Sequence, residues 1–301
     1  MHVRVPAKIN LCLGVGASRE DGFHPLATVY QAVDLCDEVR VSVRDDAELT
    51  VVVNRDGQPV DDGSVPVGRD NIAIKAAVLL REHVGRPDLG ADIVIRKEIP
   101  VAGGMAGGSA DAAATLVACN EAWGLGITRE ALEPLAAELG SDVPFLLHGG
   151  NALGSGRGEQ VNQILSRGTF HWVAVTSHEG LSTAAVYREF DRLNPVGVTE
   201  PVVAPELLAA LRSGDVKELG AALSNDLTPA ALSLRPDLLD VMDMGMSLGA
   251  VATLLSGSGP TVLFLARDPA HSEELATLLS ASGVGSDVIQ AFGPVHGVRF
   301  L

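Results

Sequence analysis

The chain has 301 residues, 47% hydrophobic and 20% charged, enough to bury a sizeable core in one large domain or two medium ones. Its 38 acidic and 22 basic side chains give a formal net charge of −16, which argues against proteins that bind nucleic acids or anionic membranes. Cys12, Cys36 and Cys119 form no C-x-x-C pair and indicate reduced thiols in a cytoplasmic protein, and we expect neither a signal peptide nor a membrane span.

The beginning of the chain is predicted to be rich in strands. Apolar and polar residues alternate there in short runs, which is typical of half-buried strands. Ser18–His24 interrupts the runs with a polar loop that contains the turn signal Asp21-Gly22. Strands are predicted at Met1–Val5, Ile9–Val15, Leu26–Val33, Glu38–Val43 and Leu49–Val53.

The middle of the chain mixes helices and strands. A loop rich in Pro, Gly and Asp is predicted at Gln58–Asp70, and glycines end the second and third helices that follow it. Thr128 is the expected N-cap of the third helix. Helices are predicted at Asn71–Val84, Ser109–Trp123 and Thr128–Leu139, and strands at Ala91–Ile95, Phe145–Leu153 and Gly158–Ile164.

The last part of the chain continues this mixture, and a second domain is predicted to begin near residue 166. The pattern predicts an α+β fold in two domains, 1–165 and 166–301. Strands are predicted at Phe170–Thr176, Ala250–Leu255, Thr261–Ala266 and Val284–Gln290, and helices at Thr183–Leu193, Pro205–Arg212, Val216–Ala222, Leu238–Gly245 and Ala270–Ala281.

A glycine-rich loop, Pro100–Ala113, is the segment with the clearest chemical meaning. Glycine lets another molecule approach the backbone closely, and the helix expected to begin near Ser109 would point free N–H groups at the loop. This combination favours a phosphate site over a flexible surface loop. No Lys-Ser or Lys-Thr follows the glycines, so the segment is not a Walker A loop, and it is no clean G-x-G-x-x-G.

Two further segments place polar side chains in apolar surroundings. Lys8 and Asn10 share one face of a strand whose other face is apolar. Asp142 follows the helix that ends at Gly140. Taken singly, Lys8 also fits an exposed strand face, and Asp142 fits an Asx turn or a helix cap.

Together these segments resemble the GHMP small-molecule kinases, which combine an N-terminal strand motif, a glycine loop ending in Ser, and a later Gly-Ser-Gly loop. The last occurs here as Ser256–Pro260. Within the superfamily the match is closest to the member whose alcohol substrate carries a cytidine diphosphate. The segments that carry the resemblance are Pro-Ala-Lys-Ile-Asn-Leu at 6–11, Arg-Glu-Asp-Gly-Phe-His at 19–24, Asp-Asn at 70–71, Pro100–Ala113 and Gly-Ser-Asp-Val-Pro-Phe at 140–145.

The resemblance implies a two-domain fold of mixed sheets and helices with the active site in the cleft between the domains. It also implies transfer of the γ-phosphoryl group of ATP to a hydroxyl in non-mevalonate isoprenoid biosynthesis. Asp142 would accept the hydroxyl proton, and Lys8 would be the second catalytic residue, holding Asp142 ionised and stabilising charge near the attacking oxygen.

The resemblance also implies the residues that bind ATP and Mg²⁺. Asn71 and Lys97 would lie at the nucleoside end, although a helix N-cap and a solvated strand end explain them equally well. No carboxylate cage for Mg²⁺ is visible in the sequence. Ala106 stands where many members of the superfamily have Gly, and we expect ordinary dihedrals there. The phosphates would contact Pro100, Val101, Ala102, Gly103, Gly104, Met105, Ala106, Gly107, Gly108, Ser109 and Ala110.

For the substrate, the resemblance implies a cytosine site near the N-terminal loop. His24 would read the base beside Phe23, where the family usually has Tyr. Tyr187 would lie on the opposite face of the base, although a buried core Tyr explains it more simply. The remaining contacts implied for the substrate or for closure of the site are Asn10, Thr183, Gly257 and Ser258.

Three other functions remain open from the sequence. One is a different GHMP kinase, acting on homoserine, mevalonate or a sugar. Another is a dinucleotide-binding oxidoreductase, against which the expected acidic residue after the glycines is missing. The third is a nucleotide-binding module without catalysis, which would have no use for Asp142 as a proton acceptor. A small-molecule partner is expected, and the sequence does not fix the oligomeric state.

Overall fold

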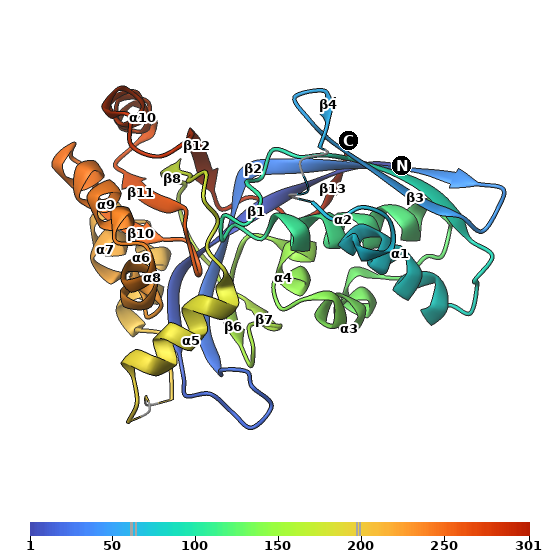
Figure 1. Cartoon of the computed structure of the whole chain (residues 1–301), viewed down its shortest axis with the longest axis horizontal. Coiled ribbons are helices and arrows are strands. Elements are labelled where there is room, and N and C mark those ends of the chain that lie inside the picture. Colours follow the sequence, from blue (N-terminus) through green and yellow to red (C-terminus); the bar gives the residue numbers. More distant parts are fainter. Residues whose placement is uncertain (61–62, 64, 197, 199) are drawn as a thin grey trace.

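The computed structural model of the chain describes residues 1–60, 63, 65–196, 198 and 200–301. Two β-sheets lie side by side, each with helices packed against it (Figure 1). Helices α1 to α4 cover one face of the larger sheet, and helices α6 to α10 surround the smaller one. The chain therefore has the α+β architecture that the mixture of elements predicts.

The larger sheet has the strand order β13-β1-β2-β5-β3-β4, with β6 and β7 continuing from β2 and β9 pairing with β1. Most neighbours are antiparallel, and β3 with β5 and β1 with β9 are parallel. Its strands are β1 (His2–Val15), β2 (Leu26–Arg44), β3 (Leu49–Arg55), β4 (Gln58–Pro59), β5 (Gly90–Arg96), β6 (Asn151–Ser155), β7 (Gln160–Gln163), β9 (Ser224–Asn225) and β13 (Arg299–Phe300).

The smaller sheet has the order β10-β11-β8-β12 and is antiparallel throughout. Its strands are β8 (Phe170–Val175), β10 (Ala252–Leu255), β11 (Val262–Ala266) and β12 (Val288–Gly293). The helices are α1 (Ile72–His83), α2 (Gly107–Ala122), α3 (Arg129–Leu139), α4 (Val143–His148), α5 (Thr183–Leu193), α6 (Pro205–Ser213), α7 (Val216–Ala222), α8 (Thr228–Leu234), α9 (Asp237–Ser247) and α10 (Pro269–Ser282), with a 3₁₀ turn at Gly68–Asp70.

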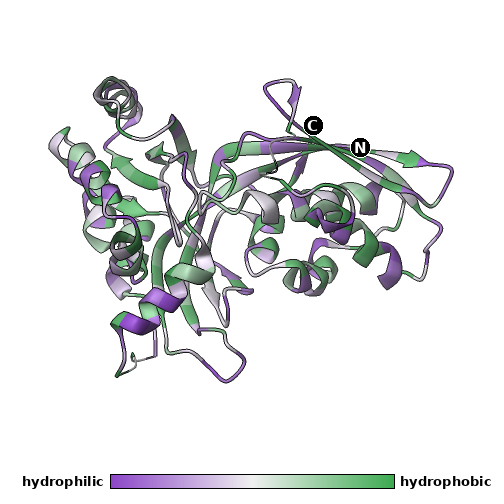
Figure 2. Ribbon diagram, viewed as in Figure 1, coloured by the Kyte–Doolittle hydropathy of each residue, from purple (hydrophilic) through white to green (hydrophobic). Residues whose placement is uncertain are grey.

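The molecule has two hydrophobic cores, and strand β1 contributes residues to both of them. This fixes the position of the polar residues in the strand. Val3 to Cys12 pack in the core under α2, whereas Leu13 and Val15 pack with the smaller sheet and α8. The polar residues in the middle of β1 therefore lie where the two halves of the molecule meet. Figure 2 shows hydrophobic residues along many of the strands, while the second half of α5 is largely hydrophilic.

Several boundaries differ from the sequence prediction. The strands predicted on either side of Pro6 are one strand, because a register shift at Pro6/Ala7 lets pairing with β2 continue. The strand predicted at Phe145–Leu153 was wrong, since α4 occupies its first half. Pro144 lies in the first turn of α4, and Gly149 and Gly150 with positive φ end the helix before β6 begins.

Toward the C-terminus, several short helices and strands were not predicted from the sequence. The last predicted strand begins instead at Val288, after Gly283 and Gly285 adopt positive φ. The elements β9, α8 and β13 were not predicted, because runs of two to seven residues carry little periodicity. The loop predicted at Gln58–Asp70 contains β4 and the 3₁₀ turn, and residues 61, 62 and 64 of it lie outside the described residues.

Candidate active site

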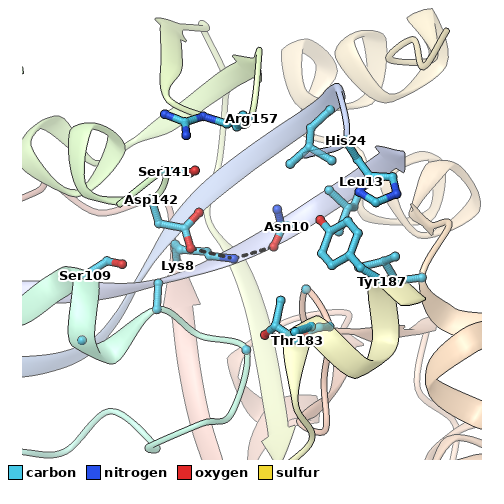
Figure 3. Close-up of a pocket in the computed structure, with 18 of the residues that line it drawn as sticks. Lys8, Asn10, Leu13, His24, Ser109, Ser141, Asp142, Arg157, Thr183 and Tyr187 are labelled. Atoms are coloured by element: carbon cyan, nitrogen blue, oxygen red, sulfur yellow. Dashed lines mark hydrogen bonds and ion pairs between the residues drawn. The ribbon is translucent and has the colours of Figure 1, made fainter. Parts of the chain in front are cut away.

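A cavity of about 910 Å³ lies between the two halves of the molecule. The glycine loop, β1 and the segment before α4 form one side, and α5 with the loop after β10 forms the other (Figure 3). Every residue expected to contact the substrate lines it: Asn10, Phe23, His24, Thr183, Tyr187, Gly257 and Ser258. Both expected catalytic residues, Lys8 and Asp142, line it too.

Helix α2 begins at the cavity without a side-chain cap. Its N-cap position is Ala106, which has no side chain able to accept a hydrogen bond. Free N–H groups and the positive end of the helix dipole therefore face the cavity, which suits an anion. Of the predicted phosphate contacts, Val101, Met105 and Ala110 do not line the cavity; the others do, namely Pro100, Ala102, Gly103, Gly104, Ala106, Gly107, Gly108 and Ser109.

The backbone of the glycine loop has more left-handed residues than the sequence predicts. The prediction of ordinary dihedrals at Ala106 was wrong, because its φ is 61° and its ψ 34°. A left-handed Ala costs about 1 kcal/mol or more, and Ala102 adopts a similar φ of 54°. At Gly104 a Cβ atom would lie 2.1 Å from the carbonyl oxygen of Ser256, so only glycine fits there.

Other segments fix this loop in place. The amide of Lys8 donates to the carbonyl oxygen of Met105 at 3.2 Å, which ties the loop to β1. The Ser256 hydroxyl donates to the carbonyl oxygen of Gly104 at 3.1 Å, which ties it to the Ser256–Pro260 loop. The loop is therefore preorganised, as a phosphate site requires.

Lys8, Asn10 and Asp142 meet at the centre of the cavity (Figure 3). Lys8 Nζ donates to Asn10 Oδ1 at 2.7 Å and lies 3.6 Å from Asp142 Oδ2. Asn10 donates in turn to the Thr28 hydroxyl at 2.8 Å, so its amide orientation is fixed. Lys8 and Asn10 are buried, and Asp142 makes no capping hydrogen bond with its side chain. The exposed-face and helix-cap explanations therefore do not account for these side chains.

Tyr30 lies against this group and was not predicted. The Lys8 ammonium lies 5.7 Å from the centre of its ring, a cation–π distance. Burial raises the pKa of Tyr30 well above its usual range, and the nearby Asp142 carboxylate adds to the shift. The phenol therefore stays neutral, and it donates to the carbonyl oxygen of Gly158 at 3.4 Å. Its sequence signal, a Tyr inside a predicted strand, is no different from that of a core residue.

At the far end of the cavity an aromatic group surrounds His24. Its ring centre lies 4.9 Å from that of Tyr187, and Phe190 meets it edge-on at 6.1 Å. His24 Nε2 lies 2.8 Å from Asp191 Oδ1, which orients the imidazole. Burial is the main cause that raises the pKa of Tyr187. Because this tyrosine also lines the cavity, its ring can contact a ligand.

Two cationic side chains at this end of the cavity were not predicted either. The Arg157 guanidinium lies 4.8 Å from the centre of the Phe23 ring, on the turn between β6 and β7. Arg188 lines the same end from α5. Their presence gives the cavity local positive charge in a chain of net charge −16. A lone Arg in a predicted turn or on an amphipathic helix carries no signal in one sequence.

Two hydroxyl groups close the cavity on the α5 side. Thr183 Oγ1 and Ser258 Oγ lie 2.8 Å apart and join α5 to the Ser256–Pro260 loop. Gly257 has a φ of 57° and packs against Lys8 and Asn10, where a Cβ atom would lie 3.6 Å from Lys8 Nζ. The Gly-Ser-Gly loop therefore contacts the centre of the site directly.

The structure does not bring Asn71 and Lys97 into the cavity. Asn71 is the N-cap of α1, accepting from the Ala73 amide at 2.9 Å, and its neighbour Ile72 lines the cavity instead. Lys97 is no solvated strand end, because its side chain is 2% exposed and bridges Asp37 and Asp111. Both residues lie behind the surface that a ligand would touch.

Among the described residues, no group of three or more His, Cys, Asp or Glu side chains is placed to hold a metal ion. Mg²⁺ fits the site only as a companion of bound phosphates, with the Ser109 hydroxyl at the start of α2 as an available oxygen ligand.

In the part of the chain that the structure describes, no helix has both the length and the apolar character that crossing a bilayer requires.

Comparisons with known proteins match both halves of the chain. The family described as GHMP kinases N terminal domain matches residues 71–150, and GHMP kinases C terminal matches residues 207–285. The 4-diphosphocytidyl-2-C-methyl-D-erythritol kinases of Thermobifida fusca and Mycolicibacterium smegmatis are 53% and 52% identical, covering 99% of this chain and 97% and 92% of theirs. A crystal structure of 4-(cytidine 5'-diphospho)-2C-methyl-D-erythritol kinase has 30% identity and a TM-score of 0.78, covering 97% of this chain and 98% of its own.

Proposed function

The chain belongs to the GHMP kinase family, and we propose on that premise that it transfers the γ-phosphoryl group of ATP to the 2-hydroxyl of 4-diphosphocytidyl-2-C-methyl-D-erythritol. The products are the 2-phosphate and ADP, in non-mevalonate isoprenoid biosynthesis. The observation that carries the proposal is that about half of the residues, along the full length of the chain, are identical to those of kinases with this name. The cavity supports it, because a phosphate-binding loop and an aromatic base site flank one carboxylate–lysine pair.

In the proposed mechanism, Asp142 orients the 2-hydroxyl and accepts its proton as the bond to phosphorus forms. A carboxylate is a weak base toward an alcohol, so the proton moves late, and positioning supplies most of the rate. Lys8 neutralises charge beside the attacking oxygen, and Asn10 holds the lysine in place at 2.7 Å. Lys8 and Asp142 can act without moving far, because their side chains already meet in the cavity.

The glycine loop would hold the triphosphate of ATP through its amides and through the N-terminus of α2. Ser109 would be the candidate protein ligand of Mg²⁺, and the ion when bound would neutralise charge on the β- and γ-phosphates. We assign no direct contact with the nucleoside to Asn71 or Lys97, because Asn71 caps α1 and Lys97 is buried between two carboxyl groups. Pro100–Ala110 is the segment that we assign to ATP.

The cytidine end would occupy the space around His24. The Phe23 and Tyr187 rings would stack on the base, and His24 would form hydrogen bonds with its edge. Thr183, Gly257 and Ser258 would contact the part of the substrate nearest the reacting hydroxyl. We expect residues 1–165 and 166–301 to act as the two domains between which the site lies.

We further propose that the enzyme works in the cytoplasm on this small-molecule substrate and binds neither nucleic acid nor membrane. Its three cysteines are free, and burial raises the pKa of both Cys12 and Cys36 to about 11, which keeps these thiols protonated. Unreactive, unpaired thiols suit a reducing compartment.

The experiment that tests the function is an ADP-release assay with a panel of alcohols. The cytidylyl substrate should be turned over at least 100-fold more efficiently, by kcat/KM, than homoserine, mevalonate or galactose. Free methylerythritol phosphate, which lacks the cytidylyl group, separates recognition of the base from recognition of the alcohol. Equal turnover of substrates without a cytidine head would contradict the proposal.

A further inference from the structure

A group of three ionisable side chains lies behind the glycine loop, away from the cavity. Lys97 Nζ lies 2.5 Å from Asp37 Oδ2 and 2.9 Å from Asp111 Oδ2. All three side chains are at most 4% exposed, and none lines the cavity. We call them the buried triad. The mechanism described above makes no use of them.

The buried triad joins three elements that meet at the base of the loop. Asp37 comes from β2, Lys97 directly follows β5, and Asp111 lies near the start of α2. Asp37 Oδ1 also accepts the backbone N–H groups of Glu98 and Ile99, at 2.7 and 2.9 Å. Asp37 therefore holds the chain where it enters the loop, and the Lys97–Asp111 bridge holds it where it leaves.

Between these two ends the loop has an unusual backbone. Ala102, Gly104 and Ala106 all have positive φ, which for alanine is unfavourable in the absence of support. The first residue of α2 also lies close to the lysine, since a Cβ atom on Gly107 would be 3.0 Å from Lys97 Nζ. Anything that loosens the triad therefore loosens the segment that must stay folded to present its amides.

Stability is a poor explanation for the triad. A buried ion pair often contributes no more than well-packed apolar residues, because desolvation offsets the attraction. This triad also contains two carboxyl groups for one ammonium, and among the described residues Asp111 Oδ1 has no hydrogen-bond partner. An arrangement with these drawbacks is explained more simply by the geometry it imposes than by a gain in free energy.

We propose that Asp37, Lys97 and Asp111 are positioning residues that fix both ends of the glycine loop and thereby set its affinity for the triphosphate of ATP without touching it. This inference depends on the proposed function, in which the loop binds ATP. It predicts that breaking the Lys97–Asp111 bridge weakens ATP binding selectively and leaves the cytidine end of the cavity unchanged.

The test compares Asp111→Ala, which deletes the acceptor, with Asp111→Asn, which keeps an oxygen for Lys97. Asp240→Ala on the exposed surface of α9 is the matched control. Isothermal titration calorimetry measures the Kd of the non-hydrolysable analogue AMP-PNP with Mg²⁺, and separately that of CDP in the presence of saturating AMP-PNP. Asp111→Ala should raise the AMP-PNP Kd about 10-fold and change the CDP Kd less than 2-fold. Asp111→Asn should stay within about 3-fold of wild type.

Lys97→Gln breaks both bridges from the other side and should cause the same selective loss of AMP-PNP affinity. Hydrogen exchange of the unliganded protein gives a readout that needs no nucleotide. Amides of residues 98–110 should exchange at least 10-fold faster in Asp111→Ala than in wild type or Asp111→Asn. Unchanged exchange and AMP-PNP affinity in Asp111→Ala and Lys97→Gln, or equal weakening of AMP-PNP and CDP, would overturn the inference. Wild-type protein that binds no AMP-PNP would contradict the proposed function instead, and the exchange result would still decide whether the triad holds the loop.

Discussion

At the scale of single residues, the site depends on a carboxylate and an ammonium that face each other without a direct hydrogen bond. Asp142 Oδ2 and Lys8 Nζ are 3.6 Å apart, while the ammonium donates to Asn10. The lysine is therefore held by a neutral partner and remains available to a negatively charged transition state. Within the described residues the Asp142 carboxylate accepts no hydrogen bond, so its oxygens are available for a hydroxyl proton.

Asp142→Asn tests the proposed proton acceptor. The amide has the same shape but cannot take the proton, so kcat should fall about 100-fold or more. Binding of AMP-PNP and of the cytidylyl substrate should stay within about 3-fold of wild type, by calorimetry. The exposed Asp45→Asn is the control for the change of charge. Turnover close to wild type would remove Asp142 from the chemistry.

His24→Ala tests the cytidine end. The change removes a ring that contacts Tyr187 and bonds to Asp191, so the KM of the cytidylyl substrate should rise about 10-fold or more. The KM of ATP should change less than 2-fold. His171→Ala on β8, outside the cavity, serves as the control. If both KM values rose equally, His24 would not be reading the base.

At the scale of elements, the unusual feature is the entry into α2. Ala106 adopts a left-handed conformation at the N-cap, and Lys8 and Ser256 hold the loop from two sides. The backbone is thus bent so that the first turn of α2 faces the cavity. The conformational energy of this bend is offset by contacts with the rest of the fold.

Ala106→Gly should make the folded protein more stable. Glycine removes left-handed strain of about 1–2 kcal/mol and adds about 0.5–1 kcal/mol of unfolded-state entropy, for a net gain of roughly 0.5–1 kcal/mol. Urea unfolding of the two proteins measures the difference. Ala110→Gly inside α2 is the opposite control and should destabilise by about 1 kcal/mol. A destabilised Ala106→Gly would mean that the alanine methyl group contributes packing that outweighs the strain.

The elements also show what one sequence can predict. Period-2 alternation placed Lys8 and Asn10 together on one face, and cap residues located α1 and α3 closely, with Asn71 and Thr128 as the observed N-caps. The left-handed Ala106 could not be predicted, because local sequence disfavours it and the contacts that impose it come from distant segments. Short apolar runs such as α4 stayed ambiguous between helix and strand.

The active site likewise was predicted only in part. That Lys8 and Asp142 would meet was implied by the family resemblance rather than by any local pattern. The buried triad was missed, because nothing in the sequence marks Asp37 and Asp111 as partners of Lys97. Burial of a charged side chain depends on tertiary packing, which a charge pattern does not record.

At the scale of the whole molecule, the buried triad links folding to pH. Burial and the neighbouring Asp37 raise the pKa of Asp111 to about 8, and Lys97 opposes the shift only in part. Between the ordinary pKa near 4 and this value, the folded protein keeps a proton that the unfolded chain has lost. The contribution of Asp111 to stability is therefore fully present at low pH and is lost as the pH rises toward 8.

Asp111→Asn should remove this dependence, because an amide does not titrate. Thermal unfolding of wild type and Asp111→Asn at pH 6, 7, 8 and 9 measures it. The Tm of the variant relative to wild type should increase from pH 6 to pH 8 and then level off. A difference in Tm that is the same at every pH would show that Asp111 keeps one charge state over this range.

The arrangement of the two halves is the premise of the whole account. Strand β1 belongs to both cores, so the glycine loop, the Lys8–Asp142 pair and the aromatic group around His24 lie in one cavity. A crystal structure with AMP-PNP, Mg²⁺ and the cytidylyl alcohol tests this premise most directly. The account predicts a triphosphate on the amides of residues 100–110, with its γ-phosphorus facing a substrate hydroxyl within about 3 Å of Asp142. A nucleotide bound elsewhere, or a hydroxyl remote from Asp142 and Lys8, would contradict it.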